Sequence, residues 1–84
     1  MKWTVVWLPS ALDDLADIWR RSNRRSLISS ASDKIDELLK RDAENQGFIQ
    51  RNKRVLHLRP LSVSFEIIPV DRLVRIVQVA EETN

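Results

Sequence analysis

The sequence contains no cysteine and a single histidine, His57. Without cysteine the chain can form neither a disulfide bond nor a thiolate metal site. One histidine is also too few for a histidine-based zinc site, and a catalytic triad would use the only one present. No apolar run reaches the roughly 20 residues that a membrane-spanning helix needs, and the first residues do not form a signal peptide. These absences predict a soluble, cytoplasmic protein that uses no metal or other cofactor and contacts no membrane.

Positive charge is modest overall but gathered in two places. The net charge is only +2 for 84 residues, a length that suits one small domain over residues 1–84. Clustered positive charge on a small domain suits nucleic acid or an acidic partner, whereas the other reading is a solvated rim around a sheet. The 51–75 cluster comprises Arg51, Lys53, Arg54, Arg59, Arg72 and Arg75, and the 20–25 cluster comprises Arg20, Arg21, Arg24 and Arg25.

Three short apolar runs dominate the second half of the chain: Val55–Leu58, Leu61–Ile68 and Leu73–Val79. The segments between them contain proline, which cannot donate a ladder hydrogen bond and favours turns. The middle run alternates apolar and polar residues, with the period of a half-buried antiparallel strand. The pattern predicts a three-strand antiparallel meander, followed after Val79 by a polar end that frays.

The first half predicts a strand and a helix. Lys2–Leu8 reads as a strand that is largely apolar on both faces, so it needs cover on each side or a partner. Ser10 is a natural N-cap for a helix over Ala11–Ser22. Asp13, Asp14 and Asp17 are interpreted as ordinary acids at the helix start, and the alternative is a paired-carboxylate acid/base site. The apolar stripe of this helix is predicted to comprise Leu12, Leu15, Ala16 and Trp19.

A second helix is predicted over Ser26–Asp42, joined to the first by a short link as an antiparallel hairpin. Its apolar side is predicted to comprise Ile28, Ala31, Ile35, Leu38 and Leu39. Ala43–Asn52 is expected to be a loop in which Gly47 allows a left-handed turn. Phe48 and Ile49 either tuck this loop against the core or form an exposed contact for a partner. Together the elements predict a two-layer α+β domain: an N-terminal strand, a helix hairpin and a three-strand meander (βααβββ).

This order of elements resembles the RelE/ParE toxin superfamily of bacterial type II toxin–antitoxin modules. The resemblance covers nearly the whole chain. It rests on W-x-x-S-A-L-D-D-L-A-D-I-W over Trp7–Trp19, R-V-L-H-L-R-P-L over Arg54–Leu61, and V-S-F-E-I-I-P-V-D-R-L-V-R-I-V-Q-V over Val63–Val79. It implies the toxin of a plasmid-stabilisation type of module, which a cognate antitoxin neutralises in a toxin–antitoxin assembly.

The family implies two mechanisms. RelE-like members cut messenger RNA in the ribosomal decoding site, using basic residues on the second and third strands and an Arg, His or Tyr near the C-terminus. ParE-like members inhibit DNA gyrase without cutting RNA. Here the only candidate general base is His57, the basic position of the third strand is Ser62, and Ala80, Glu81 and Glu82 follow the last strand. The chain has no tyrosine, and glutamates would repel a phosphate.

The resemblance and these departures favour a ParE-like, non-catalytic toxin. The alternatives are a ribosome-dependent mRNA endonuclease that uses His57, and a non-toxic remnant that only binds its antitoxin. The 51–75 cluster is assigned to the target, either DNA gyrase or the ribosome and its message. The 20–25 cluster is assigned to the antitoxin partner.

Overall fold

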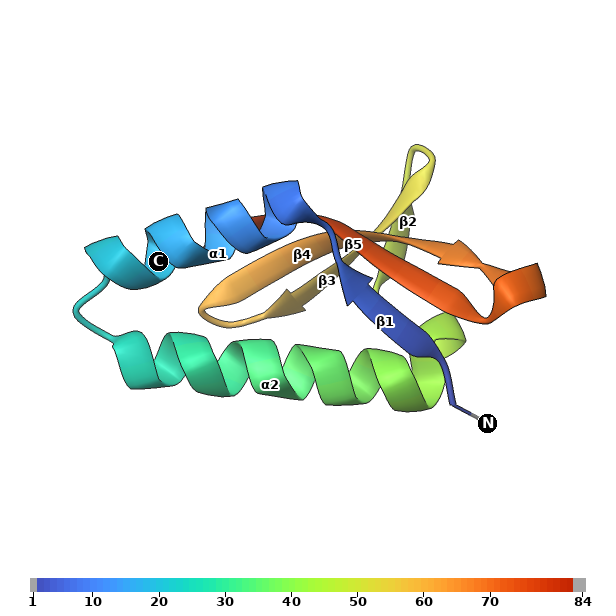
Figure 1. Ribbon diagram of the computed structural model, residues 1–84, viewed down its shortest axis with the longest axis horizontal. Helices are drawn as coiled ribbons and strands as arrows, with labels where there is room; N and C mark the ends of the chain where they lie inside the picture. The colour runs from blue at the N-terminus through green and yellow to red at the C-terminus, as the bar shows by residue number, and fades with distance from the viewer. Residues whose placement is uncertain (1, 83–84) are drawn as a thin grey trace.

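A five-stranded sheet packs against two helices in the computed structural model, which describes residues 2–82 (Figure 1). The predicted helix hairpin is confirmed: a short link joins two helices that run in opposite directions beside the sheet. The helices are α1 (Pro9–Arg21) and α2 (Arg25–Asp42), the strands are β1 (Thr4–Trp7), β2 (Phe48–Gln50), β3 (Lys53–Leu58), β4 (Leu61–Ile68) and β5 (Leu73–Glu81), and short 3-10 turns cover Ala43–Asn45 and Pro69–Asp71.

The strand order across the sheet is β1-β5-β4-β3-β2. Strands β3, β4 and β5 form the predicted antiparallel meander, while β1 lies parallel to β5, so the sheet as a whole is mixed. The last strand does not end at Val79: Ser62 pairs with Ala80 and Leu61 with Glu81, which extends β5 by two residues. Fraying after Val79 was therefore the wrong expectation for residues 80 and 81, because β4 is long enough to pair with them.

The segment expected to be a loop contains a strand, β2, which pairs antiparallel with β3. Gly47 has a φ of 70°, as predicted, and a Cβ atom there would lie 2.5 Å from the carbonyl oxygen of Val55. Phe48 and Ile49 do not tuck against the core, since their exposed fractions are 49% and 70%. Both are strong strand formers, and pairing with β3 provides hydrogen-bond partners for their backbone groups without burying their side chains.

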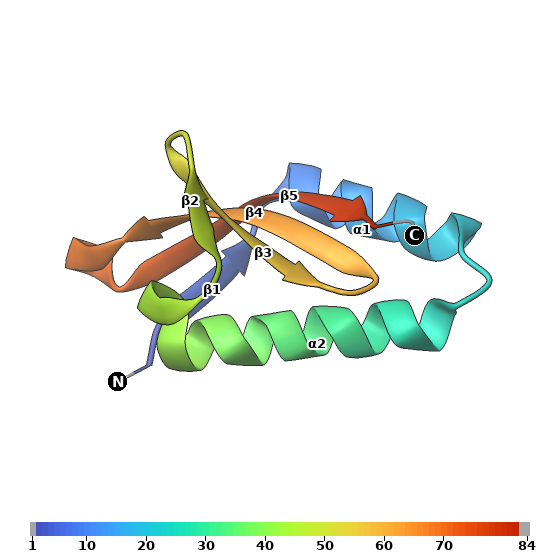
Figure 2. The ribbon, with the colours of Figure 1, turned by 180° about the vertical axis from the view of Figure 1, so that it is seen from behind.

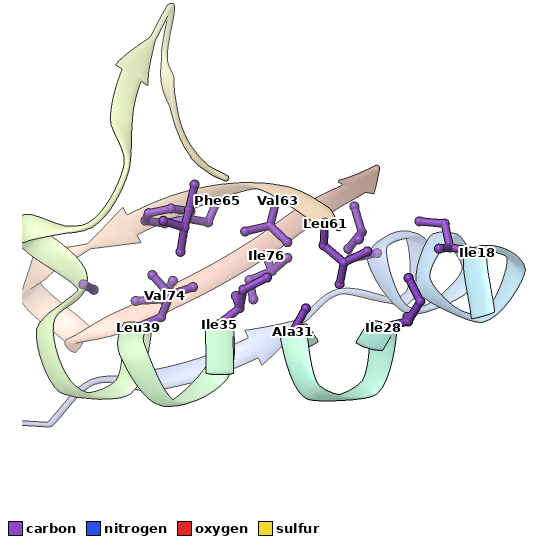
Figure 3. Close-up of a cluster of buried hydrophobic side chains, with 14 of the residues drawn as sticks. Ile18, Ile28, Ala31, Ile35, Leu39, Leu61, Val63, Phe65, Val74 and Ile76 are labelled. Carbon is purple, nitrogen blue, oxygen red and sulfur yellow. The ribbon is translucent and has the colours of Figure 1, made fainter. Parts of the chain in front are cut away.

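The core lies between one face of the sheet and the helices (Figure 3). Alternation along β4 turns Leu61, Val63 and Phe65 toward the helices, and all three are buried. The predicted apolar side of α2 meets them, with Leu38 partly buried at its margin. From α2 the buried residues are Ile28, Ala31, Ile35 and Leu39.

The apolar stripe of α1 is rotated from its predicted position. The helix buries Ala11 and Ile18, whereas Leu12 and Trp19 are 50% and 41% exposed. Leu15 alone of the predicted stripe packs partly against the core. The helix meets the sheet through the side that also carries its polar contacts to β5, and those contacts set its rotation.

Two polar side chains of α1 contact the edge of β5 where β1 no longer covers it. The hydroxyl of Ser10 donates to the carbonyl oxygen of Val77 at 3.1 Å, and a carboxylate oxygen of Asp14 accepts from the backbone N–H of Val79 at 3.2 Å. Ser10 is therefore not the N-cap, which is Leu8, with Pro9 as the first helical residue. An open strand edge needs such partners, which explains the position of both side chains.

Candidate functional site

His57 lies on the sheet face opposite the core, which we call the open face. The register aligns His57 with Ser62 of β4, and Ser62 with Ala80 of β5. Nδ1 of His57 lies 2.6 Å from a carboxylate oxygen of Glu82, and the ring stacks on Phe48 with centroids 5.4 Å apart and planes at 19°. A carboxylate at Nδ1 fixes the ring orientation, as in a Ser-His-Asp triad, and leaves Nε2 to face a ligand.

The two glutamates at the C-terminal end are both paired. Glu82 meets His57, and a carboxylate oxygen of Glu81 lies 3.7 Å from a guanidinium nitrogen of Arg24. These contacts reduce the repulsion of a phosphate that their position in the sequence predicts. Even so, Ser62 and Ala80 supply no positive charge to this face. They are the residues paired in register beside His57 on the two neighbouring strands.

The 51–75 cluster is not one surface. Four members line a single cleft of about 470 Å³ beside the β2–β3 hairpin: Arg51, Lys53, Arg54 and Arg75. Arg59 lies in the turn between β3 and β4, at the other end of β3. Arg72 follows the 3-10 turn before β5, with its guanidinium 4.6 Å from the ring centre of Trp3. Its Nε also donates to the carbonyl oxygen of Lys2 at 3.3 Å, so this arginine holds the N-terminal segment.

Within the cleft the four cations differ in their partners. Arg54 donates to the carbonyl oxygen of Glu44 at 2.8 Å, and Arg75 forms an ion pair with Glu66 at 2.8 Å. Arg51 and Lys53 are exposed and make no ion pair within residues 2–82. Arg51 and Lys53 are therefore the most exposed charges of the cleft, and Arg54 keeps its charge as well, because a carbonyl oxygen does not neutralise it.

The 20–25 cluster stabilises the C-terminal end of α1. Arg25 donates to the carbonyl oxygens of Trp19 and Arg20, both at 3.1 Å, and its guanidinium lies 4.5 Å from the ring centre of Trp19. Arg20 pairs with the side chain of Asp17. Arg21 donates to the backbone carbonyl oxygen of Asp17, and Arg24 pairs with Glu81. A role of this cluster in binding a partner stays a prediction.

An apolar groove between α1 and α2 is the feature that the sequence analysis missed. It consists of two adjoining hollows of about 300 and 390 Å³, which share Leu12, Leu15 and Ser32. The signal was in the sequence, because the predicted stripe of α1 forms one wall. That stripe was interpreted as core, and in the structure most of it faces outward. The other lining residues are Trp7, Ala16, Trp19, Arg20, Ile28, Ser29, Asp33 and Asp36.

A polar network closes one end of this groove. Nε1 of Trp7 donates to Asp36 at 3.0 Å, and Nζ of Lys40 lies 2.8 Å from the same carboxylate. The hydrogen bond with Asp36, and then its charge, raise the pKa of Lys40 above 10.5. No group of three His, Asp or Glu side chains within residues 2–82 could hold a metal ion, and no helix there is long and apolar enough to cross a membrane.

Comparison with known proteins rests on structure. No protein-family model matches the sequence, and no curated protein sequence matches it. A chain of the RelBE2 toxin–antitoxin complex from Mycobacterium tuberculosis aligns with a TM-score of 0.80 at 12% identity, covering 100% of this chain and 95% of that one. A chain of the chromosomal ParDE system from Pseudomonas aeruginosa gives 0.71 at 16% identity, with 98% of each chain covered.

A mutant of the Escherichia coli toxin RelE in the free state aligns with a TM-score of 0.67 at 16% identity, covering 96% of this chain and 84% of that one. The alignments take in the N-terminal strand, the two helices and the closing meander of this chain. These similarities span nearly the whole chain, as the sequence resemblance did. The chain has the fold of the RelE/ParE toxin superfamily.

Proposed function

We propose that the chain is the toxin of a bacterial toxin–antitoxin module and that a cognate antitoxin neutralises it by laying an apolar helix in the groove between α1 and α2. The observation that carries this proposal is the exposed apolar wall formed by Leu12 and Trp19. The structures with the same fold include proteins described as toxin–antitoxin complexes, which supports a partner of this kind.

The groove suits an amphipathic helix because it runs between two antiparallel helices, is mainly apolar beside Leu12, Ala16 and Trp19, and becomes polar toward Asp33 and Asp36. Amphipathic helices bind such grooves through side chains spaced at i, i+3, i+4 and i+7. A buried aromatic anchor often contributes about 2 kcal/mol or more to binding, and Trp19 would be such an anchor in one of the two hollows. Charges at the rim, Arg20 on one side and Asp33 on the other, would set the orientation of the partner.

The toxic action is proposed to be ParE-like: the protein blocks its target by binding and cuts no RNA. Support comes from the open face, where Ser62 and Ala80 lie beside His57 and supply no cation to stabilise a phosphate. The loss of one such stabiliser typically lowers a rate by about 100- to 1000-fold. DNA gyrase is the proposed target, in the bacterial cytoplasm, and Arg51 and Lys53 are proposed to contact it when no antitoxin covers them.

Substitution in the groove tests the antitoxin proposal. The change Leu12→Glu places a charge on the exposed wall, and the double change Leu12→Ala with Trp19→Ala removes the wall without adding charge. Both proteins should stay toxic on induced expression and should no longer be rescued by the product of the small open reading frame beside the gene. Val70→Ala is the matched control, because Val70 is an apolar residue, 89% exposed, in the β4–β5 turn.

Rescue of both groove variants as complete as that of the parent would show that the antitoxin docks elsewhere. A parent protein that is harmless on expression, and that captures no neighbouring gene product, would contradict the toxin assignment itself.

A second candidate function is cleavage of ribosome-bound mRNA, and one observation favours it. Glu82 holds the imidazole of His57 at 2.6 Å, and Phe48 provides a ring on which an RNA base could stack. The deciding assay translates a defined message on purified ribosomes with the protein added and maps new 5′ ends. The binding mechanism predicts no codon-positioned cleavage and unchanged toxicity of His57→Ala. Cleavage that disappears in His57→Ala would make His57 the general base.

A further inference from the structure

Strand β4 has an open edge near its end. Its ladder with β3 stops at the pair Arg54–Phe65, while β4 continues through Glu66–Ile68 and there pairs only with β5 within residues 2–82. Figures 1 and 2 show the reason: the β2–β3 hairpin twists away from the sheet and projects from the body of the molecule. Backbone groups of an antiparallel strand point alternately to both sides, so this edge presents donors and acceptors to another strand.

The cleft of about 470 Å³ lies along this edge. Its apolar lining includes the half-buried residues Ile67 and Ile68 of β4 and the exposed Ile49 of the hairpin, whereas Phe65 borders the cleft with its side chain buried in the core. Ile49 is 70% exposed, the highest value for a large apolar residue in any strand within residues 2–82. The cleft therefore combines an open backbone edge with apolar contacts on the strand and on the hairpin, which is the arrangement that an added strand uses.

The charge around the cleft is positive. Four cations line it against two carboxylates, Glu44 and Glu66. Glu66 is paired with Arg75, which leaves Arg51, Lys53 and Arg54 without a carboxylate partner within residues 2–82, and the first two are exposed. Both lie at the start of β3 or in the turn before it, beside the place where an added strand would enter.

We propose that this cleft binds an extended acidic peptide segment, which adds as a strand along Glu66–Ile68 with carboxylates directed toward Arg51 and Lys53. The identification of this segment as part of the antitoxin rests on the proposed function, whereas the chemistry of the site does not. A nucleic acid would satisfy the cations through its phosphates, but it would leave the strand edge unpaired and Ile49 without an apolar partner. A peptide uses all three features.

The test uses the isotopically labelled full chain and a short blocked peptide that alternates glutamate and valine. Binding should slow amide exchange and shift the amide signals at Glu66–Ile68. A peptide that alternates lysine and valine should do neither. The double reversal Arg51→Glu with Lys53→Glu should weaken binding of the acidic peptide about tenfold, since exposed charge pairs contribute modestly and are screened by salt.

The matched control is Lys2→Glu with Lys34→Glu, which makes the same change in net charge at exposed positions outside the cleft and should leave the affinity unchanged. Equal binding by all variants, or shifts without slowed exchange at Glu66–Ile68, would overturn the proposal. So would a single-stranded oligonucleotide that binds through Arg51 and Lys53 more tightly than the acidic peptide. Toxicity and antitoxin capture are separate readouts: normal capture with no peptide protection refutes only the added strand, and absent toxicity refutes only the proposed function.

Discussion

Replacing Phe65 by alanine should remove a large part of the stability of this domain. The ring is fully buried, on the sheet face that meets α2 (Figure 3). The lost burial amounts to about 1.5–3 kcal/mol, and the cavity left behind raises the total to about 3–5 kcal/mol. A domain of 84 residues has roughly 4–13 kcal/mol in all. The midpoint of thermal unfolding should therefore fall by at least about 12 °C.

Urea denaturation followed by tryptophan fluorescence measures this change, since Trp3 is buried in the same core. Phe48→Ala is the matched control: it removes the same ring from a position 49% exposed, where stacking on His57 is worth about 1 kcal/mol. The denaturation midpoint of Phe65→Ala should be far below that of Phe48→Ala, with similar slopes. Equal midpoints for the two variants would mean that the two faces of the sheet are assigned the wrong way round.

Three further outcomes are expected. Gly47→Ala should destabilise by more than about 1 kcal/mol in the same denaturation assay, because the added methyl group would meet a backbone carbonyl at 2.5 Å and φ is positive. Asp14→Ala should lose about 1–3 kcal/mol, since the N–H of Val79 loses its acceptor, whereas Asp14→Asn should recover most of this. Because the pKa of Lys40 is raised in the folded state, its pairing with Asp36 stabilises below pH 10.5 and is lost as the pH rises through the folded pKa. Titrating the unfolding midpoints of the parent and Lys40→Met should therefore show the difference between them vanish in strong alkali.

Local periodicity predicted the parts of the fold that are decided by which face is buried. The alternation of Leu61, Val63 and Phe65 against serines was sufficient to assign β4, because the opposite choice would bury hydroxyl groups. The same reasoning correctly predicted which side of α2 is buried. It failed for α1, where Trp19 was expected inside and Ile18 is found there. The helix takes its rotation from hydrogen bonds to β5, and residues far apart in sequence make those bonds.

The candidate site depended still more on long-range pairing. His57 was identified from the sequence because it is the only histidine. Its contact with Glu82 follows from the extension of β5 to Glu81, which no local sequence pattern predicted. Phe48 joins them because β2 pairs with β3. The charge clusters show the same limit: Arg72 is close in sequence to Arg75, yet one holds the N-terminal segment and the other lines the cleft.

The parallel pairing of β1 with β5 has a consequence for the order in which the protein is made and folded. Thr4 lies beside Leu73, so β1 can pair only after β5 has also emerged from the ribosome. Until then Trp3, Val5 and Trp7 have no strand to lie against, while β3 and β4 can already pair because they are neighbours in the sequence. A nascent chain that stops before β5 therefore cannot complete this sheet, because β5 is the strand that joins β1 to β4.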